Sequence, residues 1–311
     1  MIRNTNAYAA MIIAMTLVGS SLIVGKWVTN AIPVFLASFL RFGIASALLL
    51  LLLYLKEGFP KLERNACILL FLQSLTGVVL FNVCVLYGLQ MTTVVEGGII
   101  TSTSPLVISL LSFLLFKERI SIRQWLGVVM AVFGIAAIHL FDSAIADGGI
   151  SGGGFPWLGN ALLMCAVVGE SLFTLIGKRL SRQLSPLAIT TFVSVWGFVL
   201  FMPLAAYEAV TFDFSQPSSS DWLWVVYLAI IVTVVGFMLW YYGVSIVSTG
   251  TSAAFTGIIA VSSLMFSYWL LEEPIRLGHG VGMALVVAAI LYSARAEQRS
   301  SSMDPGSSVS N

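Results

Sequence analysis

The chain has 311 residues, of which 59% are hydrophobic and 9% are charged, and its formal net charge is +1. A soluble domain carries about 25% charged residues, so this composition excludes a soluble enzyme, a nucleic-acid-binding protein, a disordered chain and a disulfide scaffold. The small net charge gives no reason to expect an anionic polymer as a partner.

Ten segments are apolar over the roughly 20 residues that a membrane-spanning helix needs. In chain order they are residues 7–28, 33–55, 66–89, 93–116, 122–141, 156–178, 186–207, 221–244, 250–271 and 277–294. The segments are continuously apolar, whereas barrel strands alternate over about ten residues, so we expect helices. The first segment superficially resembles a signal peptide, but it is long and nine more segments follow, which favours an uncleaved span.

Lysine and arginine gather on one side if the N-terminus is placed in the cytoplasm. The cytoplasmic cations are then Arg3, Lys56, Lys61, Arg64, Lys117, Arg119, Arg123, Lys178, Arg179, Arg182, Arg295 and Arg299. Only Arg276 falls on the far side with certainty. The positive-inside rule therefore predicts a multi-pass protein of the cell (inner) membrane with both termini in the cytoplasm.

The sequence also matches itself at an offset of 155 residues. Tyr87-Gly88 falls on Tyr242-Gly243, Glu118-x-Ile120 falls on Glu273-x-Ile275, and Gly127 falls on Gly282. Five helices per copy is an odd number, so the second copy is inverted, as in many secondary transporters. The fold class that we predict is an all-α integral membrane protein, with ten transmembrane helices arranged as two inverted five-helix repeats.

This organisation gives four predicted regions. They are a first repeat (1–141), a Gly-rich outer linker (142–156), a second repeat (157–294) and a disordered cytoplasmic tail (295–311). The linker lacks a GxxxxGK[ST] phosphate-binding pattern, which favours a flexible connection.

Specific motifs resemble the EamA-type family of the drug/metabolite transporter superfamily. They are Pro33-x3-Ala-Ser-Phe-Leu-Arg41-Phe-Gly-Ile-Ala, Ser104-Pro105 with Phe116-Lys-Glu118-Arg-Ile120 and Trp125-Leu-Gly127, and, in the second repeat, Leu271-Glu-Glu273-Pro-Ile275 with Gly282. The second repeat has Ala260 where the family pattern has a proline. The resemblance covers about residues 8–294 and implies ten helices, cytoplasmic termini and export of amino acids or other small metabolites.

Ionisable residues within the apolar spans cost about 2.5–3.5 kcal/mol each on insertion scales, and three of them stand out. Glu170 lies deep in the sixth span, and we interpret it as a group that binds a proton or a substrate ammonium. Glu96, near the start of the fourth span, is either a second such group or an acid that the helix dipole favours. Arg41, in the second span, is interpreted as one member of a structural ion pair, because the family usually carries an arginine there.

Polar and aromatic side chains at helical spacing are further substrate-binding candidates, since a polar stripe cannot face lipid cheaply. They are Gln73, Thr76, Tyr87, Thr103, Trp240, Tyr241, Ser252 and Thr256. For the hydroxyls and the glutamine the alternative is hydrogen bonding between helices, and for Trp240 and Tyr241 it is a position facing lipid or the interface. Cys67, Cys84 and Cys165 show no CxxC or Cys/His spacing, so no metal, cofactor or disulfide is indicated.

The predicted function is a secondary transporter that exports small metabolites by alternating access. Amino acids or their derivatives are the first choice of substrate, lipophilic cations or drugs the second, and proton coupling stays open. An intramembrane enzyme lacks support because neither an HExxH pattern nor a pair of intramembrane aspartates is present, and a membrane scaffold remains a further alternative. The expected partners are a small-molecule substrate and the lipid bilayer, without nucleic acid, and a homodimer stays open.

Overall fold

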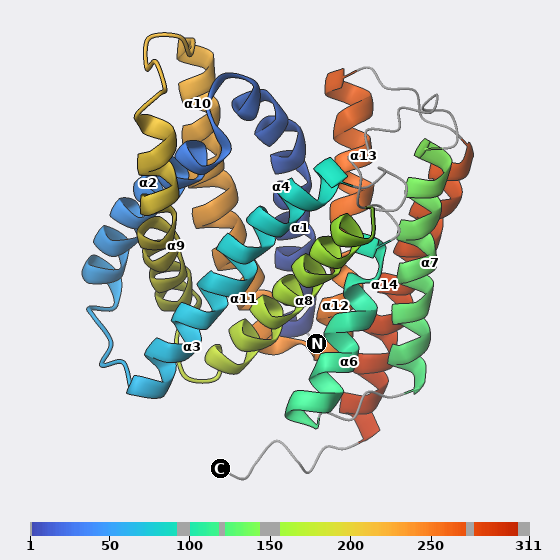
Figure 1. Ribbon diagram of the computed structural model, residues 1–311. Coiled ribbons are helices and arrows are strands. Elements are labelled where there is room, and N and C mark those ends of the chain that lie inside the picture. Colours follow the sequence, from blue (N-terminus) through green and yellow to red (C-terminus); the bar gives the residue numbers. More distant parts are fainter. Residues whose placement is uncertain (1, 92–99, 118–121, 144–155, 272–276, 304–311) are drawn as a thin grey trace.

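The structure is a computed structural model that describes residues 2–91, 100–117, 122–143, 156–271 and 277–303. These residues are helical apart from short connections (Figure 1). The helices are α1 (Ile2–Ala31), α2 (Val34–Lys56), α3 (Arg64–Ser74), η1 (Leu75–Leu80), α4 (Phe81–Met91), α6 (Ser104–Phe116), α7 (Ile122–Ser143), α8 (Pro156–Leu180), α9 (Pro186–Ala209), α10 (Ser219–Tyr227), η2 (Leu228–Gly236), α11 (Phe237–Ile246), α12 (Thr249–Phe255), α13 (Ile258–Leu271) and α14 (Leu277–Met303).

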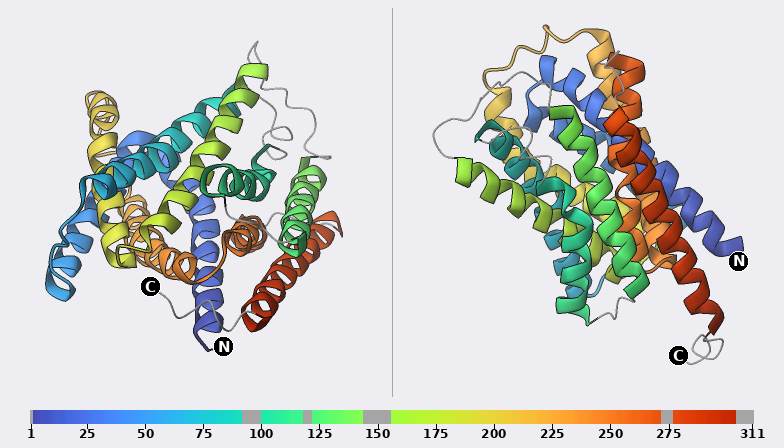
Figure 2. Two further views of the ribbon diagram at one scale, coloured as in Figure 1. Left: turned by 90° about the horizontal axis from the view of Figure 1, so that it is seen from below. Right: turned by 90° about the vertical axis from the view of Figure 1, so that its right-hand side faces the viewer.

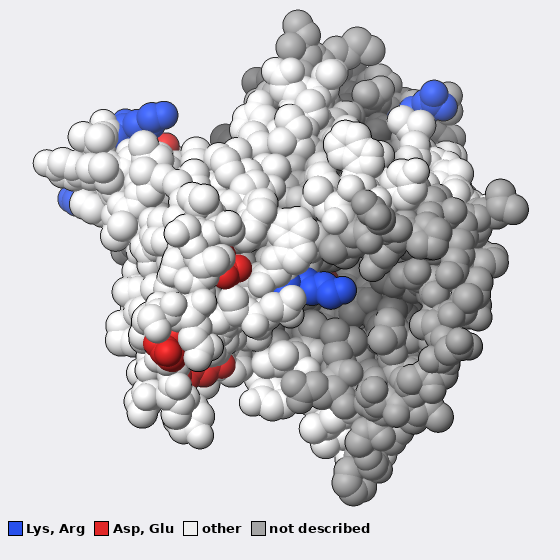
Figure 3. All heavy atoms as spheres, turned by 90° about the horizontal axis from the view of Figure 1, so that it is seen from above, with Lys and Arg blue, Asp and Glu red and all other residues white. Residues whose placement is uncertain are grey.

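Within the described ranges, 7 helices are long and apolar enough to cross a membrane. Three shorter apolar helices accompany them, at Ser104–Leu115, Trp125–Ala137 and Gly280–Ser293. On the face in Figure 3, the charged side chains are few and lie scattered among uncharged ones. The protein is therefore an all-helical, multi-pass membrane protein.

The helices pack as close pairs around α1 and α8. α2 lies along α9, and α7 lies along α14 (Figures 1 and 2). α8 contacts α3, η1, α4 and α6, while α1 contacts η2, α11 and α13. Glycines permit the close approach: Gly88 of α4 lies against Leu163 of α8, and Gly243 of α11 lies against Met11 of α1.

Two helices contain π-helical segments, η1 and η2, each with α-helix before and after it. Such segments are rare and are frequent at functional sites. In η2 the Thr233 hydroxyl donates a hydrogen bond to the Leu228 carbonyl at 3.0 Å, so a side chain is a hydrogen-bond partner of the backbone there.

Two carboxylates connect α2 and α9, one at each end of the pair. Glu208, in the last turn of α9, accepts the Leu36 N–H in the first turn of α2 at 2.8 Å. Glu57, directly after α2, accepts the Ser185 hydroxyl at 2.5 Å, and Ser185 caps α9 by accepting the Ala188 N–H at 3.0 Å. An acid at a helix start complements the unpaired N–H groups and the helix dipole, so these contacts fix the pair in register.

The C-terminal region differs from the sequence prediction of a disordered tail from residue 295. The last helix, α14, continues to Met303. The physical reason is that Ala294-Arg-Ala-Glu-Gln-Arg299 consists of strong helix formers, so a polar sequence extends a helix that the apolar span nucleates. Residues 304–311, and residues 144–155 of the predicted linker, lie outside the described residues.

Candidate functional site

Glu170 lies half-buried within α8 and contacts the first half of the chain. Its carboxylate accepts a hydrogen bond from the hydroxyl of Ser104 at 2.7 Å. Ser104 is buried and is the first residue of α6. The partner of this carboxylate among the described residues is thus a hydroxyl rather than a cation, which leaves its charge uncompensated when it is ionised.

A second polar contact joins α3, α8 and α11. Its residue on α8, Phe173, lies three residues after Glu170. The side-chain amide of Gln73, in α3, donates to the Phe173 carbonyl of α8 at 2.9 Å and to the Tyr241 hydroxyl of α11 at 3.0 Å. Gln73 and Tyr241 are fully buried. The Oε1 atom of Gln73 has no hydrogen-bond partner in the described part of the chain, so it is a free acceptor.

A glycine makes room for this polar contact. A Cβ atom at Gly177 would lie 2.6 Å from the amide nitrogen of Gln73 and 2.7 Å from the Tyr241 ring. The bare backbone of α8 therefore lets Gln73 and Tyr241 meet beside it.

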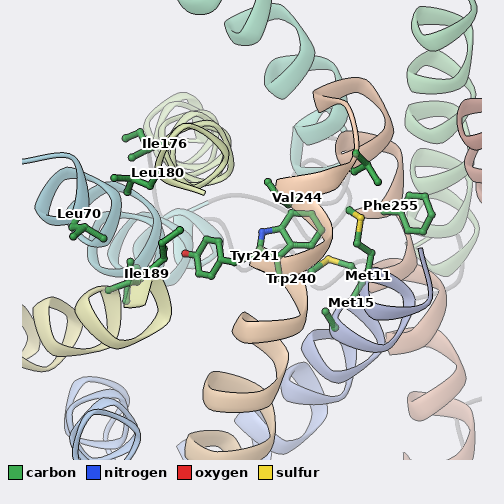
Figure 4. Close-up of a cluster of buried hydrophobic side chains, with 14 of the residues drawn as sticks. Met11, Met15, Leu70, Ile176, Leu180, Ile189, Trp240, Tyr241, Val244 and Phe255 are labelled. Atoms are coloured by element: carbon green, nitrogen blue, oxygen red, sulfur yellow. The ribbon is translucent and has the colours of Figure 1, made fainter. Parts of the chain in front are cut away.

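Two phenylalanine rings lie near the ring of Tyr241. Phe173 lies 6.0 Å from Tyr241 and 5.8 Å from Phe237, measured between ring centroids. Trp240 is 4% exposed and Tyr241 is 0% exposed, so neither side chain faces lipid. In Figure 4 Tyr241 points from α11 toward Ile189 and Leu180, and Met11 and Met15 of α1 lie on the side of Trp240.

The other predicted site residues do not join this group. The hydroxyls of Thr76, Thr103, Ser252 and Thr256 donate to carbonyls of their own helices or of the turn just before them. Tyr87 is 44% exposed on α4. Glu96 lies outside the described residues.

Arg41 connects α2 to η2. Its Nε donates to the Thr233 hydroxyl at 2.6 Å, and its guanidinium carbon lies 5.4 Å from the centroid of the Phe42 ring. The sequence predicts an ion pair for Arg41, whereas the contact in the structure is a hydrogen bond to the Thr233 hydroxyl. The residue types predicted a partner from another helix but could not specify which one.

We expect Arg41→Leu to lower the folded yield more than it changes any substrate preference, because the bond to Thr233 holds α2 on η2. Hydrogen bonds between membrane helices contribute about 0.6–2 kcal/mol. The measurement is size-exclusion yield and the melting temperature in detergent, with Thr233→Val as the variant that removes the same bond from the other side. Normal folding with altered selectivity would instead place Arg41 in a binding site.

The sequence does not predict two of the side-chain contacts in this region. Ser104 stands out in the sequence only as part of the Ser104-Pro105 motif, and the Phe173 carbonyl carries no sequence signal because every residue has a carbonyl. A polar hydroxyl next to a proline within an apolar span is a sequence signal that could have indicated a role for Ser104. No comparable signal exists for a backbone acceptor.

The chain resembles known proteins along nearly its whole length. It matches the EamA-like transporter family over residues 5–140 and again over residues 157–295. It is 46% identical to the "Uncharacterized transporter YetK" of Bacillus subtilis (strain 168) over 292 residues, 94% of this chain and 87% of that relative. It is 25% identical to "WAT1-related protein At3g02690, chloroplastic" of Arabidopsis thaliana, covering 83% of this chain and 62% of that relative.

A crystal structure shares the fold, with a TM-score of 0.76 and 19% identity, over 95% of this chain and 98% of that chain. The relatives, the apolar helices and the repeated family match agree with one another. The chain belongs to the EamA-like transporter family.

Proposed function

We propose that this membrane transporter exports small metabolites, amino acids or compounds derived from them, by alternating access, and that Glu170 exchanges a proton during the cycle. The observation that carries the proposal is the contact of the Glu170 carboxylate with the Ser104 hydroxyl inside an apolar bundle. An ionised carboxylate without a cation is costly there. The group is therefore suited to take up a proton in one state and to release it, or bind an ammonium, in another.

An inverted duplication is part of this proposal, with halves at residues 1–141 and 157–294. Under the 155-residue offset, η1 (Leu75–Leu80) falls within η2 (Leu228–Gly236). The same offset relates Gly88 to Gly243, and each packs against the first helix of the other half, at Leu163 and at Met11. Both correspondences support two copies of one five-helix unit that can rock against each other.

The polar and aromatic group between the halves supports an amine-bearing substrate. Gln73 belongs to the first half, and Phe173 and Tyr241 belong to the second. The Oε1 atom of Gln73, which has no partner among the described residues, could accept a hydrogen bond from an ammonium group, and the faces of aromatic rings attract cations. The same rings favour lipophilic cations as a second class of substrate.

Solute flux tests the proposal. Proteoliposomes loaded with a mixture of labelled amino acids and lipophilic cations are placed in a pH gradient, and retention is compared with liposomes that lack protein. We expect loss of at least one compound that depends on both the protein and the gradient. If every compound is retained as in empty liposomes, the transport proposal fails for these two classes.

We expect both termini to lie in the cytoplasm and the linker to lie outside. The start of α1 and the end of α14 lie at the same end of the bundle (Figure 1), and the cations predict that this end is cytoplasmic. A reporter fused after Ser302 should behave as cytoplasmic, and a tag at Gly149 should be labelled from outside. Labelling of Gly149 only from the cytoplasm would contradict the inverted halves.

A further inference from the structure

The packing of α4 on α8 sets two cysteines side by side. Gly77, just before α4, lies against Phe173 of α8, and Gly88 of α4 lies against Leu163. Residue numbers rise along η1 and α4 while those of the residues they contact on α8 fall, so α4 and α8 run in opposite directions. Cys84 falls between Gly77 and Gly88, and Cys165 falls between Leu163 and Phe173, so the two cysteines occupy the same level of the interface.

The side chains complete this contact. The Cys84 thiol and the Cys165 thiol interact through a side-chain hydrogen bond. Cys84 is buried, whereas Cys165 is exposed on the surface of the chain. Cys67, the third free cysteine, lies in α3, toward the other end of the same helical segment. The structure therefore contains one accessible thiol with a second thiol directly behind it, and a third at a distance.

We propose that Cys84 and Cys165 form a redox-reactive dithiol site, which an apolar two-electron oxidant of the organic hydroperoxide class converts into a disulfide between α4 and α8. The accessible Cys165 sulfur attacks the hydroperoxide, which leaves as an alcohol, and Cys165 becomes a sulfenic acid. The Cys84 sulfur then attacks the Cys165 sulfur, the S–S bond forms, and water leaves with the Cys84 proton. Two thiols are oxidised by two electrons and one O–O bond is reduced.

The disulfide has a structural consequence. α4 lies in the first half of the chain and α8 in the second, so the bond ties the two halves together. A disulfide fixes its sulfur atoms about 2.05 Å apart and its Cα atoms within about 7 Å. Oxidation therefore ties α4 covalently to α8, and reduction removes this tie. This inference does not depend on the substrate or on the role of Glu170.

Counting free thiols tests the proposal. The full-length protein in lipid nanodiscs is treated with cumene hydroperoxide, freed of oxidant, denatured, and labelled with a maleimide–polyethylene glycol that retards the chain once per free thiol. The reduced protein, with 3 cysteines, should show three additions. After oxidation it should show one, at Cys67, and dithiothreitol should restore all three. The intact mass should fall by two hydrogen atoms.

Cys67→Ser is the matched control, and it should pass from two additions to none. In Cys84→Ser and in Cys165→Ser, no intramolecular disulfide should form and no loss of two hydrogens should be seen. Three additions after oxidation of the parent protein would overturn the proposal. A covalent dimer on a non-reducing gel, or a gain of oxygen in place of the loss of hydrogen, would also overturn it.

Discussion

Replacing Glu170 with glutamine should abolish efflux driven by a pH gradient while the protein still inserts and folds. The amide keeps the shape of the side chain and can still accept the bond from Ser104, but it cannot titrate. Removing a charge from the membrane interior relieves a cost of about 2–3 kcal/mol, so the folded yield should not fall. Flux in proteoliposomes with and without a pH gradient is the measurement.

The same variant separates the two possible roles of this carboxylate. If Glu170 carries only the proton, exchange of substrate across equal pH should continue in Glu170→Gln. If it binds the substrate ammonium, exchange should stop as well. Glu208→Gln is the matched control, because Glu208 caps α2 at the end of the bundle and should retain pH-driven flux. Full pH-driven efflux by Glu170→Gln would eliminate the coupling proposal.

Adding a single methyl group at Gly169 should destabilise the protein strongly. A Cβ atom there would lie 2.5 Å from the backbone carbonyl oxygen of Thr76, and a backbone atom cannot rotate away. α8 must therefore separate from η1, and overpacking of this kind typically costs about 1–3 kcal/mol. The melting temperature of Gly169→Ala in detergent should fall accordingly.

Gly25→Ala is the control for this substitution, because nothing lies within 4 Å of the added Cβ. Alanine is the better helix former by about 1 kcal/mol, so this variant should be as stable as the parent or slightly more stable. Equal melting temperatures for the two variants would show that α8 does not approach η1 as closely as the structure has it.

The sequence by itself determined the class of protein and the positions of most helices. Apolar runs long enough for a bilayer give spans with nearly the observed bounds, such as residues 33–55 for α2 and 186–207 for α9, because each run must bury its own backbone hydrogen bonds. The family was also readable, because its motifs are local. Glu170 stands out in the sequence because placing a carboxylate within a membrane-spanning segment costs free energy, whichever helices surround it.

Only the tertiary structure decided which side chains meet. Gln73 and Tyr241 come from helices far apart in the sequence, and their contact depends on a glycine of a third helix. Thr233 became the partner of Arg41 because α2 packs on η2, and Cys84 met Cys165 because α4 and α8 cross in opposite directions. Helical periodicity fixes the face that a residue occupies, but the relative height and rotation of two packed helices depend on many side chains at once, so spacing in the sequence does not reveal these contacts.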